Sequence, residues 1–483
     1  MDSLKEYDYK NVLKYFTDLC AIPHGSGNVK EISDFLLDFA KKQGVSAYQD
    51  EALNVCAFLP ATAGYEDKPT LMLQGHMDMV CEKDAESSHD FKTDPLDLFL
   101  ENGWLGARGT TLGGDDGAAV AIMMAMMADK EFSHPAMELV ITTDEETGMD
   151  GAKALDLTHF KAKYLVNLDS EAEGIYTCGC AGGERVSVTF RMERTDFTGQ
   201  VIKISLNGLK GGHSGVEINR NRTNANKAMA RFLFTLREKV GFAVSDIHGG
   251  KLDNAIPREC FAEISVPSFD EKEFTAAFNK VREIMKYELL ATEPDADISF
   301  ELPSACETET EVFNDTSTEK LLYFLINCPN GVQRMSGKLE GLVESSLNMG
   351  ILYTADTAAV IRFSLRSSVY SYREFMRNRI AYLAEVIGGE TETEGGYPGW
   401  DYEVDTHLQK TYASLYRKEY DKEPVMAVIH AGLECGLIKD RMKDLDIISI
   451  GPDMKDIHSP NERLNLESVV RVYKFVEKLA VEL

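Results

Sequence analysis

The stretch Thr70-Leu71-Met72-Leu73-Gln74-Gly75-His76-Met77-Asp78 combines a short apolar run with a histidine and an acid at its end. The run Thr70–Gln74 is typical of a buried strand. Imidazole is a common zinc ligand, and Asp78, two positions further on, can lie on the same side of the strand and orient the ring of His76. A His-x-Asp pair is also common on protein surfaces, so this stretch predicts a metal site only if other acids join it.

Strands and helices alternate around this stretch. Tyr9–Gln43 has the apolar spacing of two amphipathic helices, Val55–Leu59 has the pattern of a strand, and Gly117–Ala128 is an Ala- and Met-rich helix. Further strands are expected at Met137–Thr142 and Tyr164–Leu168. The alternation predicts an α/β domain with a mixed, mostly parallel sheet flanked by helices.

Beyond residue 184 the pattern changes to the alternation of half-buried strands, as in Val186–Phe190 and Val201–Leu206. The Gly- and Glu-rich stretch Gly388–Gly399 is expected to be a linker back to the first domain. The tail, Asp405–Leu483, again has the pattern of helix, strand, loop and helix. We therefore expect a first domain of residues 1–183 and 396–483, with an inserted α+β domain of residues 184–395.

Length and charge narrow the class of protein. The 483 residues are enough for two domains. With 51 basic and 79 acidic side chains the net charge is −28, which argues against nucleic acid and anionic membranes as partners, because both attract basic patches. The sequence has neither a signal-peptide pattern nor an apolar segment of about 18 residues, so we expect a cytoplasmic protein whose nine cysteines are reduced and structural.

Two segments of the sequence contain adjacent acids, one within a glycine-rich loop and the other after a strand. The loop Gly109–Gly117 places Asp115 and Asp116 before a helix, and these carboxylates suit a metal better than a phosphate, which prefers backbone amides and lysine. The acids Asp144-Glu145-Glu146 follow the strand Met137–Thr142 and would repel one another unless cations neutralise them. Taken singly, the first segment is also explained as an acidic helix N-terminus, and the second is also explained as a solvated loop.

Two more candidate ligands lie beyond strands. Asp169 follows Tyr164–Leu168, and His458 lies in a loop after the C-terminal strand. Because ligand sites in open α/β sheets lie beyond the carboxyl ends of the strands, His76, Glu145-Glu146 and Asp169 are expected to converge. A set of His, Asp and Glu without Cys is typical of a catalytic site for two zinc ions.

These segments, in this order, resemble the aminoacylase and carboxypeptidase-like dinuclear zinc metallopeptidases, and among them the aminoacyl-histidine dipeptidases (Xaa-His dipeptidase, peptidase D type). The resemblance extends over essentially the full length and includes Gly-Gly-His-Ser-Gly at 211–215 and Ile-His-Ala-Gly-Leu-Glu-Cys-Gly at 429–436. It implies a zinc exopeptidase-like catalytic domain, a lid and hydrolysis of short peptides, in particular Xaa-His dipeptides including β-alanyl-histidine. An aminotripeptidase, an N-acyl-amino-acid amidohydrolase and a non-catalytic metal-binding protein remain alternatives.

The resemblance also implies the metal ligands. Two Zn²⁺ ions per chain are expected, with Co²⁺ or Mn²⁺ as substitutes. One ion would be held by His76 and Asp169, the other by Glu146 and His458, and Asp115 would bridge both.

Roles for the neighbouring acids follow from the same resemblance. Asp78 resembles the residue that orients His76. Glu145 resembles the general base, which takes a proton from zinc-activated water and returns it to the leaving amine. Asp116 lies beside the bridging acid and is given no metal bond.

Three residues of the inserted domain resemble substrate-binding residues of the family's lid. His213 would stabilise the oxyanion, and Asn254 and Arg366 would hold the C-terminal carboxylate of the dipeptide. The segment 184–395 is about twice as long as the lid of the simpler members, which dimerise so that this histidine reaches the partner's site. We therefore expect His213 to act within its own chain, whether the protein is a monomer or a homodimer; activity recovered by mixing Glu145→Gln and His213→Ala chains would contradict this.

Overall fold

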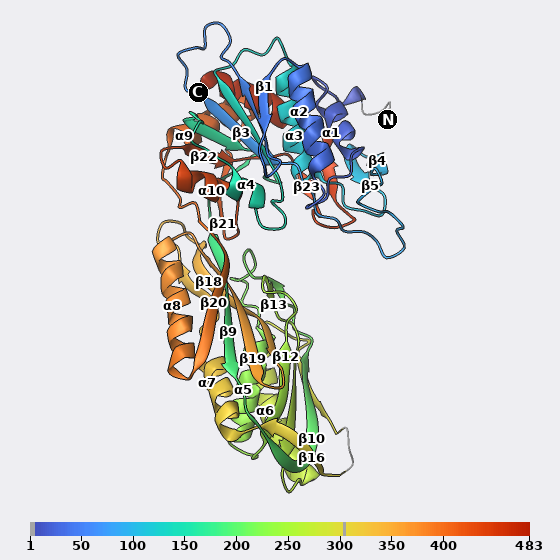
Figure 1. The fold of residues 1–483 in the computed structure, drawn as a ribbon, viewed down its shortest axis with the longest axis vertical. Helices are drawn as coiled ribbons and strands as arrows, with labels where there is room; N and C mark the ends of the chain where they lie inside the picture. Colours follow the sequence, from blue (N-terminus) through green and yellow to red (C-terminus); the bar gives the residue numbers. More distant parts are fainter. Residues whose placement is uncertain (1–4, 303–305) are drawn as a thin grey trace. The chain divides into compact units, whose positions relative to one another are not determined.

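The computed structural model describes residues 5–302 and 306–483. The chain divides into two compact units. The first unit comprises residues 1–180, 400–428 and 433–483, and the second comprises residues 181–399 and 429–432. In Figure 1 the blue and red ends of the chain build the first unit together, whereas the green to orange middle builds the second. Part of the Ile-His-Ala-Gly-Leu-Glu-Cys-Gly segment therefore belongs to each unit.

The first unit is built on an eight-stranded sheet of order β1-β2-β6-β3-β7-β22-β8-β21. Its central strands β6, β3, β7 and β22 run parallel, while β1 and β2 are antiparallel to their neighbours. This mixed sheet flanked by helices confirms the predicted fold class. The strands are β1 (Ser46–Gln49), β2 (Val55–Leu59), β3 (Leu71–His76), β6 (Met137–Thr142), β7 (Tyr164–Asn167), β8 (Ile175–Cys180), β21 (Val425–Ile429) and β22 (Asp446–Ser449).

Helix α3 (Gly114–Ala128) is the most buried helix of this unit. Its side chains from Gly117 to Met127 are all buried, as its Ala- and Met-rich sequence requires. It packs against β3, α1 and α11. The other helices are α1 (Val12–Cys20), α2 (Lys30–Lys42), α4 (Asp150–Ala154), α9 (His407–Tyr420), α10 (Glu434–Arg441) and α11 (Leu466–Glu482).

A small sheet of order β23-β24-β5-β4 completes the first unit. It joins the segment before α3 to the segment before α11, which lie far apart in sequence. Its strands are β4 (Leu98–Glu101), β5 (Trp104–Ala107), β23 (Met454–Lys455) and β24 (Arg463–Asn465).

The second unit is built on a ten-stranded sheet of order β15-β10-β14-β12-β18-β19-β9-β20, with β16 paired to β10 and β17 to β18. Over the described residues, the helices α5 (Ala225–Arg237), α7 (Asp315–Asn327) and α8 (Tyr370–Val386) pack on this sheet, and α6 (Glu271–Leu289) packs against α5 and against Phe300 of β15. Its strands are β9 (Gly182–Arg191), β10 (Arg194–Asn207), β12 (Ala243–Gly249), β14 (Cys260–Val266), β15 (Asp297–Glu301), β16 (Thr308–Phe313), β17 (Gly331–Met335), β18 (Val343–Thr354), β19 (Ala358–Ser367) and β20 (Gly389–Tyr397), besides the short pair β11 (Gly212–His213) and β13 (Ala255–Ile256).

The prediction that Gly388–Gly399 is a linker was wrong. Residues 389–397 form β20, which pairs antiparallel with β9 at the edge of the ten-stranded sheet. The alternation of Thr and Glu has the period of a strand, and an edge position tolerates the glutamates because they face solvent. Exposed Glu390, Glu392 and Glu394 also discourage another strand from adding to this edge.

Over the described residues, none of the helices combines the length and apolarity needed to cross a lipid bilayer.

Candidate metal centre

The carboxyl ends of three neighbouring parallel strands carry the predicted ligands. Strand β3 ends at His76 and lies between β6 and β7. Glu145 and Glu146 follow β6, and Asp169 follows β7. Since parallel strands end at one edge of the sheet, the fold brings these side chains together, as the sequence predicted.

Asp115 lies between two histidines. Its Oδ1 is 3.1 Å from Nε2 of His76, and its Oδ2 is 3.2 Å from Nε2 of His458. The same Nε2 of His458 is 3.0 Å from Oε1 of Glu146, while Nε2 of His76 is 3.7 Å from Oδ1 of Asp169. Each oxygen of Asp115 therefore faces a different ligand set, which is the arrangement that a bridging carboxylate requires.

Among the described residues, three groups could each hold an ion, because the donor atoms within each group all lie within 4.8 Å of one another. They contain only imidazole nitrogens and carboxylate oxygens, a donor set suited to zinc, manganese or cobalt. One group contains Asp116, which the sequence left without a metal bond. The groups are His76 with Asp116 and Asp169, His76 with Glu145 and Glu146, and Asp115 with Glu146 and His458.

The charges of this cluster depend on one another. Hydrogen bonds to Asp115 and Glu146 raise the pKa of His458 to about 11. Burial raises the pKa of Asp169 to about 8, and burial likewise raises the pKa of Glu145 well above its usual value. So many buried acids cannot all ionise without positive charge beside them, and divalent cations would supply it.

Asp78 fixes two parts of the site. Nδ1 of His76 lies 3.0 Å from the carbonyl oxygen of Asp78, so it must donate there, which leaves Nε2 with the lone pair that a metal needs. The Asp78 carboxylate accepts from the backbone N–H of Glu145 at 3.1 Å, from that of Glu146 at 3.4 Å and from the Ser26 hydroxyl at 2.8 Å. Asp78 thus holds the turn of Glu145 and Glu146 as well as the ring of His76.

Glu434 is a buried acid beneath the centre for which no role was predicted from the sequence. It begins α10, is fully buried, and accepts hydrogen bonds from the Thr142 hydroxyl at 2.6 Å and from the amide of Gln74. Gln74 in turn accepts from the Asn167 amide at 2.7 Å. This network ties together the three strands that carry the ligands, and burial raises the pKa of Glu434 to about 7.

The predicted His213 and Arg366 lie close together in the second unit. Nδ1 of His213 accepts the backbone N–H groups of Gly215 and Val216 at 3.3 and 3.2 Å, so its proton belongs on Nε2, where it can be donated. Burial, and then Arg366, lowers the pKa of His213, which keeps the ring neutral. Nε of Arg366 is buried and has no hydrogen-bond partner in the described part of the chain.

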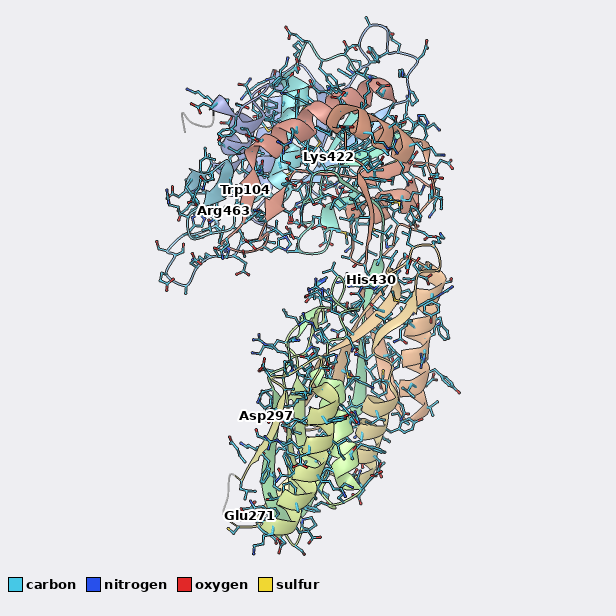
Figure 2. All side chains as sticks on the ribbon, turned by 180° about the vertical axis from the view of Figure 1, so that it is seen from behind. Trp104, Glu271, Asp297, Lys422, His430 and Arg463 are labelled. Carbon is cyan, nitrogen blue, oxygen red and sulfur yellow. The ribbon has the colours of Figure 1, made fainter. Side chains whose placement is uncertain are left out.

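His430, labelled in Figure 2, belongs to the same cluster and was not predicted. Its Nε2 is 2.7 Å from the Ser346 hydroxyl, and burial followed by the charge of Arg366 lowers its pKa to about 3. A side chain at position 215 would collide with the His430 carbonyl and with His213, so Gly215 allows this close approach. The motif around His430 was the only sequence signal for it.

The predicted Asn254 lies with His213 in the wall of a cavity of about 350 Å³ in the second unit. The Asn254 carbonyl accepts the backbone N–H of Ser214 at 2.8 Å, which fixes the loop that carries His213. Arg366 is not part of this cavity wall. The structure therefore places His213 beside both other predicted residues, but not all three around one cavity.

An open α/β sheet with clustered acids and histidines beyond its central strands is the arrangement expected of a metal-dependent hydrolase. The chain belongs to peptidase family M20/M25/M40, whose model matches residues 72–482. The peptidases of this family are metal-dependent. The resemblance predicted from the sequence is thereby confirmed.

Two relatives match nearly the whole chain at the same sequence identity. It is 35% identical to the cytosol non-specific dipeptidase of Escherichia coli (strain K12), and the alignment covers 100% of this chain and 99% of that protein. The crystal structure of the aminoacylhistidine dipeptidase from Vibrio alginolyticus is 35% identical, with a TM-score of 0.86 and 98% of each chain covered. Human carnosine dipeptidase 1, at 15% identity and a TM-score of 0.52 over 99% of this chain and 97% of that one, shares the fold.

Proposed function

We propose that this protein is a metal-dependent dipeptidase that prefers Xaa-His dipeptides, β-alanyl-histidine among them. The observation that carries the proposal is Asp115, whose two oxygens face His76 and His458 with Glu145 close by. The relatives from Escherichia coli and Vibrio alginolyticus, named as dipeptidases, support the substrate class. The name of the former also supports the cytoplasmic location expected from the sequence.

Two Zn²⁺ ions are the proposed cofactors, with Co²⁺ or Mn²⁺ as substitutes. When bound, they would polarise the peptide carbonyl and acidify the attacking water. His76 and Asp169 would hold one ion and Glu146 and His458 the other, with Asp115 between them.

Glu145 is the proposed general base. It would take the proton of the attacking water and return it to the amine that leaves, which requires a carboxylate that can be protonated near neutral pH. Burial raises the pKa of Glu145 in this direction, while the charge of His76 opposes the shift. The backbone of Glu145 is fixed by Asp78, so the base would be held in place for both proton transfers.

The second unit offers polar groups for the peptide carbonyl and the C-terminal carboxylate of a dipeptide. Nε2–H of His213 is suited to a developing oxyanion, and the guanidinium of Arg366 to the C-terminal carboxylate. The side-chain amide of Asn254 would also bind this carboxylate. A carboxylate ligand would give Arg366 the anionic partner that its buried Nε lacks among the described residues.

Metal removal followed by a substrate panel tests the proposal. We expect chelation to abolish activity and Zn²⁺, Co²⁺ or Mn²⁺ to restore it. Among β-alanyl-histidine, other Xaa-His dipeptides, dipeptides without histidine, a tripeptide and an N-acetyl amino acid, kcat/KM is expected to be highest for the His-ending dipeptides. A protein that binds two ions per chain but cleaves no dipeptide with any of these metals would refute the dipeptidase.

A further inference from the structure

Glu462 is a buried acid in the first unit that takes no part in the proposed hydrolysis. Only 2% of its surface is exposed. Its Oε2 accepts the backbone N–H of Leu112 at 2.7 Å and that of Gly113 at 3.1 Å, and its Oε1 accepts those of Gly114 at 2.7 Å and Asp115 at 3.4 Å. One carboxylate thus receives four consecutive backbone donors from the loop that carries the bridging Asp115.

The backbone N–H groups of residues 112–115 require a hydrogen-bond acceptor at the position of the Glu462 carboxylate. Gly113 has φ of 70°, a left-handed conformation that turns successive N–H groups toward one point. Buried N–H groups are costly without an acceptor, and the first N–H groups of α3 have none within the helix. The Glu462 carboxylate supplies this acceptor, and a side chain at position 114 would approach its Oε1 to 3.2 Å.

The backbone of Glu462 is itself held in place. Its N–H donates to the Ser459 carbonyl at 3.0 Å, one residue after His458. The following strand β24 pairs with β5, where Leu464 lies opposite Leu105. Figure 2 marks this small sheet by Arg463 and Trp104. The carboxylate is therefore fixed to the segment that carries His458 on one side and to the Asp115 loop on the other.

We propose that Glu462 is a positioning residue of the metal centre, which sets the distance between Asp115 and His458. The inference rests on the proposed two-metal function. Asp115 faces both histidines, so a displaced loop would disturb both ions at once. Partners in the layer behind metal ligands typically change metal affinity by about 10- to 100-fold.

The test compares Glu462→Gln with the wild type in metal affinity. The carboxamide keeps the shape but turns an NH₂ donor toward backbone N–H donors, so the loop should shift. We expect the folded metal-free variant to bind Zn²⁺ about 10- to 100-fold more weakly, measured by competition with a chromophoric chelator. Circular dichroism of the same samples reports whether the variant is folded.

Glu138→Gln is the matched control. Glu138 is also buried in the first unit and accepts two backbone N–H groups, from Lys161 at 2.8 Å and Ala162 at 3.1 Å, but it lies at the amino end of β6, away from the ligands. We expect Glu138→Gln to lose thermal stability like Glu462→Gln and to keep wild-type metal affinity within about twofold.

Unchanged affinity in Glu462→Gln, or an equal loss in Glu138→Gln, would overturn the inference. If Glu462→Gln does not fold, Glu462→Asp replaces it, because this variant keeps the charge and withdraws the carboxylate by one methylene group. Wild-type affinity in Glu462→Asp would then overturn the inference as well. A wild-type protein that binds no metal would instead refute the proposed function, so the two failures are distinguishable.

Discussion

Glu145→Gln is expected to lower kcat by about 10²- to 10⁴-fold while both metal ions stay bound. Glutamine has nearly the same shape as glutamate, but it cannot take a proton from water and return it to the leaving amine. The Asp78 carboxylate holds this position through the backbone N–H, which the substitution leaves intact. Steady-state kinetics on an Xaa-His dipeptide and metal analysis of the same sample check both parts of the prediction.

Asp150→Asn is the matched control for Glu145→Gln. Asp150 is an exposed acid five residues further along the same segment, paired with Lys153 at 3.0 Å. We expect this variant to keep wild-type kcat and metal content. The geometry also allows Glu145 to be a ligand, since its donor atom lies with those of His76 and Glu146. A Glu145→Gln protein that loses metal would assign that role, and one with wild-type kcat would exclude Glu145 as the base.

The convergence of the metal centre was predictable because it depends on local patterns and one general rule. Apolar runs end shortly before His76, Glu145 and Asp169. Parallel strands present their carboxyl ends at one edge of the sheet. Each of these signals lies within a few residues of the ligand it predicts. The signal for His458 was weaker, because this histidine lies in a loop well beyond the C-terminal strand, and its role as a ligand was predicted from the resemblance to the family.

The supporting acids were not predictable from the sequence. Glu434 contacts Thr142 across 292 positions, and Glu462 contacts Leu112 across 350. No local sequence pattern predicts such a pair, because only the tertiary fold brings the acceptor close to its donors. The strand β20 was missed for another reason: its alternation involves Thr and Glu, which at a sheet edge is as compatible with a strand as with a polar linker.

His458→Ala is expected to reduce the metal content from about two ions per chain to about one. Nε2 of His458 lies 3.0 Å from Glu146 and 3.2 Å from Asp115, so its loss leaves one ion with carboxylates alone. The other ion keeps His76, whose ring is fully buried and fixed by Asp78. Activity should fall with the lost ion, because the proposed hydrolysis uses both ions to polarise the peptide carbonyl and acidify the attacking water.

The difference in exposure predicts which ion leaves first. The His458 side chain is 46% exposed, whereas that of His76 is 1% exposed, so a chelator in solution reaches the His458 side more easily. In the wild type we expect two phases of metal removal, of which His458→Ala lacks the faster one. His248→Ala is the matched control, because this exposed histidine also pairs with a carboxylate, that of Asp246 at 2.9 Å, and lies in the second unit. Two ions retained in His458→Ala, or a lost ion in His248→Ala, would contradict the assignment of His458 as a ligand.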